Sequence, residues 1–351
     1  LMDADSVLGL VEIGAVRATR DMVEVGEITP NVRAEHAVNP DSTLLPVARA
    51  NGITYVRTAP RGGLIAGLSA LIRLHGWTWE DLTVSAPLAL QVEWPRMLID
   101  RRPQARTKPK EQEKRRDERL RTLKEAFATA RAYLKARDAA DADHPVDVDA
   151  RWEAMRPVLE GDIPVIVDAD EITAMEAAME WAEEEGVRLI LSGGADAWRL
   201  ADVLAEKDIP VILGSTLSRP RRSWEPYDTA YKNPMRLHEA GVRFCISGGG
   251  SSFMASNSRN LPYNAAMAES FGLPHEEAIR SITLYPAQIL GVDDRIGSLE
   301  MGKDATLMVT DGDPLDIRTQ VLQVWIDGEQ MDLSNRHHDL YERYQQRLQG
   351  R

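Results

Sequence analysis

Acidic side chains follow an apolar run in the middle of the sequence, where they could bind a cation. Asp168, Asp170 and Glu171 come after Ile163–Val167. Two or three carboxylates that meet at one pocket can hold a hard cation such as Mg²⁺, Mn²⁺ or Ca²⁺, because these ions prefer oxygen ligands. The same carboxylates could instead be hydrated or paired with an arginine. The residues alone leave both interpretations open.

Two glycine-rich segments, each beginning with a serine, offer a second kind of chemistry. Ser192-Gly193-Gly194 and Ser247–Ser252 both follow apolar runs. Backbone N–H groups in such turns can bind an anion, although plain turns between a strand and a helix have the same composition. The loop after residues 209–213 carries three arginines, which could hold an acidic substrate or could be solvated. These are Arg219, Arg221 and Arg222.

Regular alternation of strands and helices is predicted from residue 163 onward, and it would bring these residues together. Short apolar runs predict strands at 163–167, 187–191, 209–213 and 242–246. Amphipathic helices are predicted between them, the first of which ends at Gly186. Continuous apolar strands alternating with helices indicate a parallel sheet covered on both faces, and the repeated units favour a (β/α)₈ TIM barrel. The carboxyl ends of the strands then surround one pocket, the barrel mouth.

The first 125 residues are less regular. The runs Ile53–Val56 and Leu82–Val92 predict strands, and the glycine-dense Ala59–Gly67 between them is either a ligand loop or a plain turn. Because seven strands are visible in all, we expect an eighth within residues 1–100. Residues 101–125 contain eleven Lys or Arg and five Asp or Glu. We predict a mobile charged segment over 101–118 and a helix from Leu120. We interpret this region as a solvated insertion rather than a nucleic-acid site, because no aromatic residues lie between the basic ones.

The composition excludes several classes of protein. Of 351 residues, 43% are hydrophobic and 28% are charged, as is typical of a globular chain. No apolar run reaches the roughly 18 residues that a membrane-spanning helix needs. The formal net charge of −13 argues against nucleic acid or an anionic membrane as the main partner. The single cysteine, Cys245, excludes an intrachain disulfide and is predicted to be a buried structural thiol.

Two C-terminal segments resemble the signature of the amidohydrolase superfamily, most closely that of its imidazolonepropionase-like branch. They are Thr283–Gly291 and Gly297–Ala305. Val165–Glu171 is similar to the family's fifth barrel strand, and Leu1–Val7 is similar to its first. The resemblance implies a hydrolase of non-peptide C–N bonds, commonly oligomeric. It also implies that half of a β-sandwich, which in the family precedes the first barrel strand, is missing from this chain.

The residues and the resemblance together predict an α/β fold, a distorted (β/α)₈ TIM barrel with a small appended β-sandwich element. The barrel is expected over residues 1–295, including a charged helical insertion at 101–160. The C-terminal part of the sandwich is expected at 296–330, with a hairpin formed by Val321–Ile326 and Asp327-Gly328. A polar C-terminal helix is expected within 331–351.

The resemblance also implies positions for metal ligands, and this chain departs from the family at every position that can be matched. The family holds one or two divalent ions with His-x-His on strand one, a histidine on each of strands five and six, and an aspartate on strand eight. The corresponding residues here are Asp5, Val7, Asp168, Ser192 and, to within one residue, Gly249. Valine and glycine have no ligand atom, and serine is a poor ligand for zinc. We therefore expect a degenerate or non-standard centre, with no zinc and no other cofactor.

Asp5 and Asp168 are the predicted catalytic residues, and Ser192, Ser247 and Glu171 are the predicted substrate-binding residues. Because strands one and five surround one pocket, Asp5 and Asp168 should approach each other, with a cation, a water cluster or an arginine between them. The expected partners are a small-molecule substrate or ligand and a second copy of the chain or a paralogue, with no nucleic acid and no membrane. The alternative to an enzyme is a catalytically silent homologue, which acts as an oligomeric scaffold or binds a small molecule.

Overall fold

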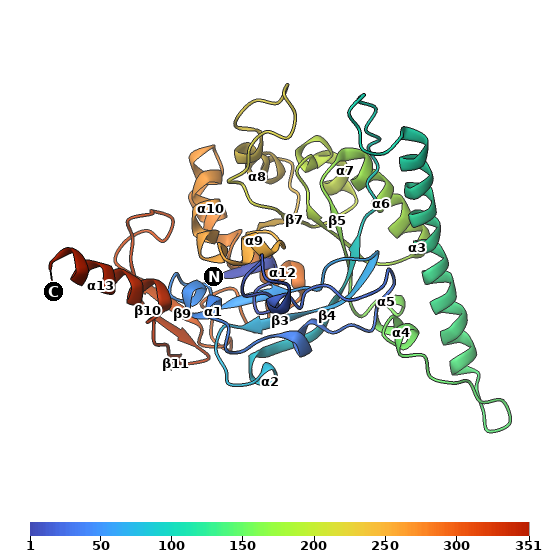
Figure 1. Ribbon diagram of the computed structural model, residues 1–351, viewed down its shortest axis with the longest axis horizontal. Coiled ribbons are helices and arrows are strands. Elements are labelled where there is room, and N and C mark those ends of the chain that lie inside the picture. Colours follow the sequence, from blue (N-terminus) through green and yellow to red (C-terminus); the bar gives the residue numbers. More distant parts are fainter. Residues whose placement is uncertain (351) are drawn as a thin grey trace.

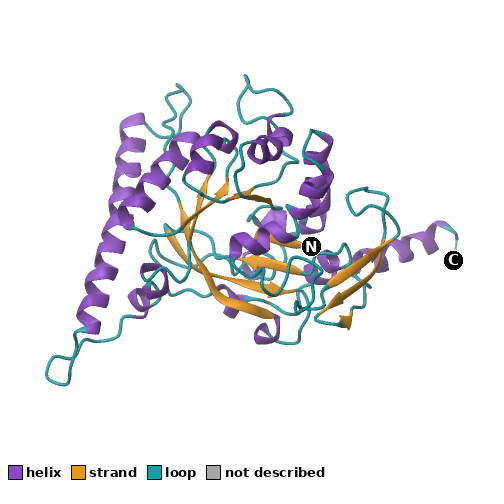
Figure 2. Cartoon of the chain, turned by 180° about the vertical axis from the view of Figure 1, so that it is seen from behind, coloured by secondary structure: helices purple, strands orange, loops and turns teal. Residues whose placement is uncertain are grey.

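Eight strands form one sheet, in the order β1 to β8, that nearly closes into a barrel with helices outside it (Figures 1 and 2). The structure is a computed structural model that describes residues 1–350. The strands are β1 (Met2–Ser6), β2 (Tyr55–Thr58), β3 (Ile65–Arg73), β4 (Thr83–Glu93), β5 (Val165–Ala169), β6 (Leu189–Gly193), β7 (Val211–Leu213) and β8 (Phe244–Ile246). Ser281 and Ile282 link the last strand to the first, since Ile246 N–H donates to the Ser281 carbonyl and Met2 N–H donates to the Ile282 carbonyl. The predicted distorted TIM barrel is confirmed.

The distortion lies in β3, which runs antiparallel to both of its neighbours, whereas the other adjacent pairs are parallel. β3 is the eighth strand that we expected within residues 1–100. Its first residues fall in the glycine-dense run that we interpreted as a loop, and Gly67 stands inside the strand. β2 is parallel to β1, and a short loop joins its carboxyl end to the antiparallel β3. This loop therefore lies at the same end of the barrel as the carboxyl ends of the parallel strands.

Alternation along the strands determines which side chains reach the mouth. Ile166 and Ile190 pack in an inner apolar cluster, while Val165 and Leu191 pack in the larger outer cluster. Successive side chains of a strand point to opposite faces, so the residues two positions beyond the inner isoleucines face inward again. Asp168 and Ser192 occupy these positions and are directly paired in register. Cys245 is buried in the inner cluster, which confirms the predicted buried thiol.

Helices surround the barrel, except that α12 (Leu284–Leu290) packs against its inner apolar cluster, and the ends of the helices follow local sequence signals. They are α1 (Leu44–Arg49), α2 (Trp79–Leu82), α6 (Ile172–Glu185), α7 (Ala201–Glu206), α8 (Thr229–Glu239), α9 (Ser252–Ala255), α10 (Leu261–Ser270), α11 (His275–Arg280) and α12 (Leu284–Leu290). α6 ends at Gly186, in the left-handed conformation that glycine adopts without strain. The stretch from His275 to Leu290 forms two helices rather than one, because Pro286 lacks an N–H group and is tolerated only in the first turn of a helix.

The insertion between β4 and β5 contains α3 (Pro109–Asp138), α4 (Ala150–Glu153) and α5 (Arg156–Leu159). α3 lies along the side of the barrel as the long green helix of Figure 1. It begins eleven residues earlier than our predicted start at Leu120, so the second half of the segment that we predicted to be mobile is helical. Ion pairs between residues four apart, such as Arg115 with Glu111, help to stabilise these polar first turns without apolar packing.

A three-stranded antiparallel sheet follows the barrel, formed by β9 (Leu307–Thr310), β10 (Val321–Ile326) and β11 (Glu329–Gln330). The turn Asp327-Gly328 has positive φ at both residues, as the predicted hairpin requires. α13 (Arg336–Leu348), capped by the Asn335 side chain, comes last and extends away from the body of the molecule (Figure 2). Within residues 1–350, no helix is both long and apolar enough to cross a membrane.

The contact between α3 and the barrel gives a prediction for stability. Phe127 is fully buried, and its ring lies 5.1 Å edge-to-face from that of Trp181 on α6. Phe127→Ala should lower the free energy of unfolding by about 3–5 kcal/mol, because it leaves a cavity beneath the helix. Phe253→Ala is the matched control, since Phe253 is 74% exposed, and it should change stability by less than about 0.5 kcal/mol. Urea unfolding measures both, and equal effects would contradict the buried position of Phe127.

Candidate active site

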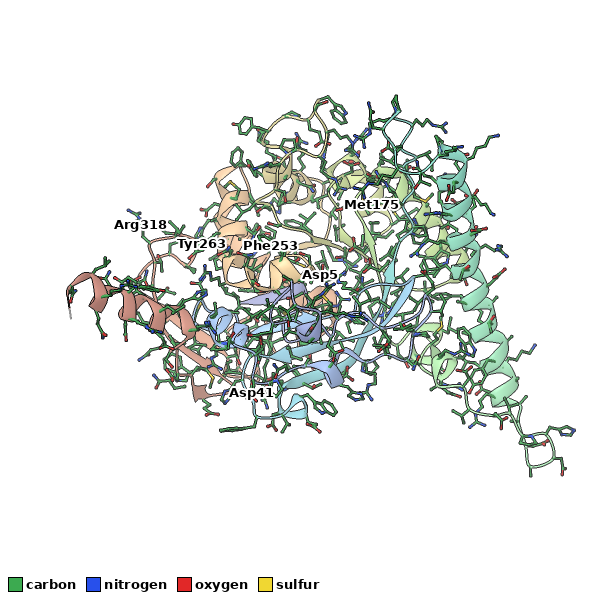
Figure 3. All side chains as sticks on the ribbon, viewed as in Figure 1. Asp5, Asp41, Met175, Phe253, Tyr263 and Arg318 are labelled. Carbon is green, nitrogen blue, oxygen red and sulfur yellow. The ribbon has the colours of Figure 1, made fainter. Side chains whose placement is uncertain are left out.

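A cavity of about 400 Å³ opens at the carboxyl ends of β5 to β8. The carboxylates of Asp5, Asp168 and Asp170 line one part of it, and the loop between β7 and α8 lines another with Arg219 and Arg221. Figure 3 shows Asp5 near the centre of the molecule, where the barrel and the surrounding loops meet. A larger cavity, of about 780 Å³, lies at the amino ends of the parallel strands. In TIM barrels catalytic residues gather at the carboxyl ends, so the smaller cavity is the candidate site.

The Arg61 guanidinium lies behind the wall of this cavity and joins three carboxylates. It forms ion pairs with Asp5, with Asp168 at 3.3 Å and with Glu93 at 3.8 Å. Arg61 comes from the loop between β2 and β3, and we call these four residues the Arg61 centre. Of the alternatives that we predicted between Asp5 and Asp168, the structure contains the arginine.

Glycine at two places makes room for the Arg61 centre. Gly250, in the glycine-rich segment after β8, lies against the guanidinium, and a Cβ atom there would overlap it. Gly62 has a positive φ and turns the chain directly after Arg61. The glycine-dense run Ala59–Gly67 and the glycine-rich segment after β8 therefore meet at Arg61, which our list of catalytic candidates missed. The glycine density around it was the available signal.

A second arginine, Arg57, lies beneath the centre in the interior of the barrel. It is fully buried, and its Nη1 lies 3.2 Å from the Asp5 carboxylate. Its other nitrogens donate to the Gln91 side chain at 2.5 Å and to the Ser69 hydroxyl at 3.0 Å. Burial lowers the pKa of Arg57 to about 10, so it stays protonated near neutral pH. Asp5 is therefore held between two guanidinium groups, those of Arg57 and Arg61.

Asp168 has a different environment, although it shares Arg61 with Asp5. Its side chain is 38% exposed, toward the cavity that it lines. Partial burial raises its pKa to about 7, and the neighbouring carboxylates of Asp5, Glu93 and Asp170 act in the same direction against the opposing effect of Arg61. A carboxyl group that titrates near neutral pH can both accept and return a proton. Asp168 is therefore the group at the mouth best suited to proton transfer.

The predicted substrate-binding residues lie outside the lining of the cavity. The Ser192 side chain is buried, and its hydroxyl has no hydrogen-bond partner within residues 1–350. Ser247 is buried too, and its hydroxyl accepts the Gly249 N–H at 3.0 Å, which shapes the turn. Glu171 immediately precedes α6 and does not contribute to the cavity. It is the glycines beside these serines that line the cavity, so the segments contribute backbone and space rather than hydroxyl groups.

The three arginines of the β7–α8 loop have three different environments. Arg222 binds Asp196 with two hydrogen bonds of 2.7 Å and also pairs with Glu225, which fastens the loop to the barrel. Arg221 pairs with Asp170 at the edge of the cavity. Arg219 lines the cavity without an ion-pair partner in the described part of the chain. Of the three, Arg219 is the one available to an acidic ligand.

A divalent metal of the superfamily type does not fit these residues. The guanidinium of Arg61 lies between the two carboxylates that stand at the ligand positions of strands one and five. Val7 is buried in the apolar core, Gly249 has no ligand atom, and none of the histidines within residues 1–350 lines the cavity. Zinc would require imidazole or thiolate ligands, and any cation would be repelled by the guanidinium.

Comparison with known proteins gives a match to a family model and a match to a solved structure. The sequence model of the family Amidohydro_3, described as Amidohydrolase family, matches residues 244–332. A crystal structure of an amidohydrolase from Thermotoga maritima MSB8 superposes with a TM-score of 0.82 and is 28% identical, covering 94% of this chain and 85% of that one.

Curated relatives match shorter segments. The amidohydrolase tasK of Hapsidospora irregularis is 40% identical over 72 residues, 20% of this chain and 7% of that protein. A putative N-acetylgalactosamine-6-phosphate deacetylase of Escherichia coli K12 is 41% identical over 63 residues, 18% of this chain and 35% of the other. An N-substituted formamide deformylase of Arthrobacter pascens is 42% identical over 59 residues, 15% and 11% of the two chains. These findings support the assignment of this chain to the amidohydrolase superfamily, while the matches span about a third or less of each curated relative.

Asp3, which the sequence did not single out, gives the site a pH dependence. It is buried on β1, accepts N–H groups of Asp5 at 3.2 Å and Gly248 at 3.3 Å, and burial raises its pKa to about 7. The folded state therefore binds the carboxyl proton of Asp3 more tightly than the unfolded state does. Proton binding at Asp3 stabilises the folded state fully below pH 3.8, and this contribution is lost as the pH rises to about 7. Asp168 acts in the same direction.

We predict that Asp3→Asn reduces this pH dependence. The amide keeps an acceptor for the two N–H groups but has no proton to lose. Between about pH 5 and pH 8, the wild type should lose more unfolding free energy than Asp3→Asn does, by an amount on the order of a few kcal/mol. Urea unfolding at the two pH values measures the difference. The exposed Asp41 provides the control variant Asp41→Asn, which should follow the wild type, and identical curves for all three proteins would contradict the prediction.

Proposed function

We propose that this chain is a hydrolase of non-peptide C–N bonds in which the Arg61 centre takes the place of the superfamily's metal centre. The superfamily assignment supports the reaction class, and two relatives are named as a deacetylase and a deformylase. The observation that carries the proposal is the guanidinium between Asp5 and Asp168. The signature segments Thr283–Gly291 and Gly297–Ala305 remain our reason for placing the chain near the imidazolonepropionase-like branch.

The proposed reaction uses the groups that line the cavity. Asp168, as carboxylate, accepts a proton from a water molecule whose oxygen bonds to the carbonyl carbon of the substrate. When the C–N bond breaks, Asp168 returns that proton to the leaving nitrogen, so that one water is consumed and an acid and an amine are released. Asp5 and Arg61 hold the Asp168 carboxylate in place. Arg219, on another wall of the cavity, would bind an acidic group of the substrate.

A catalytically silent homologue is the second candidate, and one observation favours it. Arg61 already pairs with three protein carboxylates, so little of its charge is left for a substrate. In that case the same cavity binds a small molecule without turnover, and the barrel serves as a scaffold for a second copy of the chain or for a paralogue. The two candidates share the absence of a metal and differ in whether Asp168 transfers a proton.

The replacement of the metal by Arg61 predicts a gain of metal binding. The purified wild type should contain no zinc and should not be stabilised by Mn²⁺. In Arg61→Ala, the freed carboxylates of Asp5, Asp168 and Glu93 should bind Mn²⁺ through oxygen ligands. The variant will be less stable, since it leaves partly buried carboxylates unpaired, and saturating Mn²⁺ should raise its Tm by roughly 5 °C or more.

Arg221→Ala is the matched control for that experiment, because it frees Asp170 at the cavity but leaves the Arg61 centre intact. It should show no response to Mn²⁺. Metal analysis of the wild type and thermal unfolding with and without Mn²⁺ provide the measurements. A wild type that binds zinc or Mn²⁺ at the mouth, and loses it in Asp168→Ala, would refute the arginine centre.

The reaction itself is tested with the protein after treatment with EDTA. We expect it to hydrolyse at least one member of a panel of N-formyl and N-acetyl amines. Asp168→Asn should lower kcat by about 10²-fold or more, the usual contribution of a positioned proton-transfer group. Asp170→Asn, which changes a second cavity carboxylate, should stay within about tenfold of the wild type. Loss of turnover with EDTA would overturn the proposal, and saturable binding of the panel without any turnover would establish the silent homologue.

A further inference from the structure

A separate cavity, of about 490 Å³, lies between the loop that follows β4 and the first turns of α3. In Figure 1 this loop stands beside the upper end of α3. Arginine dominates its walls, and Asp100 is the one acidic residue among them. The arginines come from both sides and are Arg96, Arg102, Arg106, Arg115, Arg116 and Arg119.

The loop is fixed against the helix, so the arginines face a formed cavity. The Gln112 side chain of α3 donates to the carbonyl oxygens of Asp100 at 2.9 Å and Thr107 at 2.7 Å, and it accepts the Asp100 N–H at 2.8 Å. A single amide thereby joins two points of the loop to the third residue after Pro109, where the helix begins. Five of these arginines belong to the charged segment 101–125, and Arg96 precedes it. The structure places all six around one cavity.

The arginines of the cavity are incompletely neutralised. Arg102 pairs with Asp100, and Arg119 pairs with Glu27, each at 2.8 Å. Arg115 and Arg116 pair with the neighbouring carboxylates of Glu111 and Asp117 on α3. Arg96 and Arg106 have no ion-pair partner in the part of the chain that the structure describes. The whole chain carries a net charge of −13, so a concentration of positive charge in one cavity is a local feature. Clustered guanidinium groups repel one another unless an anion lies between them.

We propose that this cavity binds an oligophosphate group. The planar guanidinium matches the geometry of phosphate oxygens and binds them with paired hydrogen bonds. Arginines on two facing walls suit a ligand with several adjacent negative charges better than a single anion. The lining contains no aromatic side chain on which a base could stack, so the phosphates are the recognised part. Inorganic triphosphate and the phosphate chain of a nucleotide share this chemistry.

The test is titration calorimetry of the full chain with sodium triphosphate and, in a second arm, with ATP. We expect saturable binding of triphosphate, with comparable affinity for ATP, and weaker binding as the ionic strength rises to about 0.15 M. The double variant Arg96→Gln and Arg106→Gln should bind about 100-fold more weakly, since each lost charge-assisted contact costs about tenfold. Arg119 is left unchanged, because it also donates to the Gly63 carbonyl beside the Arg61 loop.

Arg101→Gln is the matched control. Arg101 belongs to the same loop but does not line the cavity, and it pairs with Glu113 at 3.0 Å. It should bind triphosphate within about twofold of the wild type, and circular dichroism should show that all variants keep their helix content. Failure of the wild type to bind triphosphate would overturn the proposal. Equal weakening by the control and by the double variant, or binding of ATP without binding of triphosphate, would overturn it as well.

Discussion

The pairing of Arg61 with Asp5, Asp168 and Glu93 is the interaction on which the barrel mouth depends. Carboxylates brought this close together repel one another, and removing them from water adds a further cost. A metal ion can offset both costs, but it must be bound from solution. A guanidinium can offset them as well, and it is already part of the chain. Once Arg61 occupies the space between the carboxylates, Gly250 must lack a side chain.

The family match and the Arg61 centre lie in different parts of the chain. The barrel superposes on an amidohydrolase with a TM-score of 0.82, and the matched family segment, residues 244–332, lies at the C-terminal end of the chain. The four residues of the Arg61 centre come from β1, the β2–β3 loop, β4 and β5, all of which lie outside that segment. Similarity therefore supports the architecture and the reaction class, while the side chains at the mouth determine whether and how a reaction proceeds.

Arginine has two opposite roles in this molecule. Arg57, Arg61 and Arg222 are partly or fully buried, and each is matched by carboxylates that hold a loop or a strand end in place. The arginines beside α3 are more exposed, and some of them have no partner in the described chain. Composition does not distinguish these roles, because the difference lies in what the fold places opposite each guanidinium.

Local patterns were enough to predict much of this structure. Apolar runs identified the four strands between residues 163 and 246, with boundaries within about two residues. Gly186 marked the end of α6, and Asn335 and Asp327-Gly328 marked the last helix and hairpin. The approach of Asp5 to Asp168 followed from barrel geometry. The position of Arg61 did not, because it depends on β3 running antiparallel between β2 and β4 and on contacts with residues 56 and 107 positions away. The cluster of arginines likewise forms only when Gln112 fastens a loop to a helix. Short-range periodicity specifies which face of an element is buried, whereas only the closed barrel decides which charges meet.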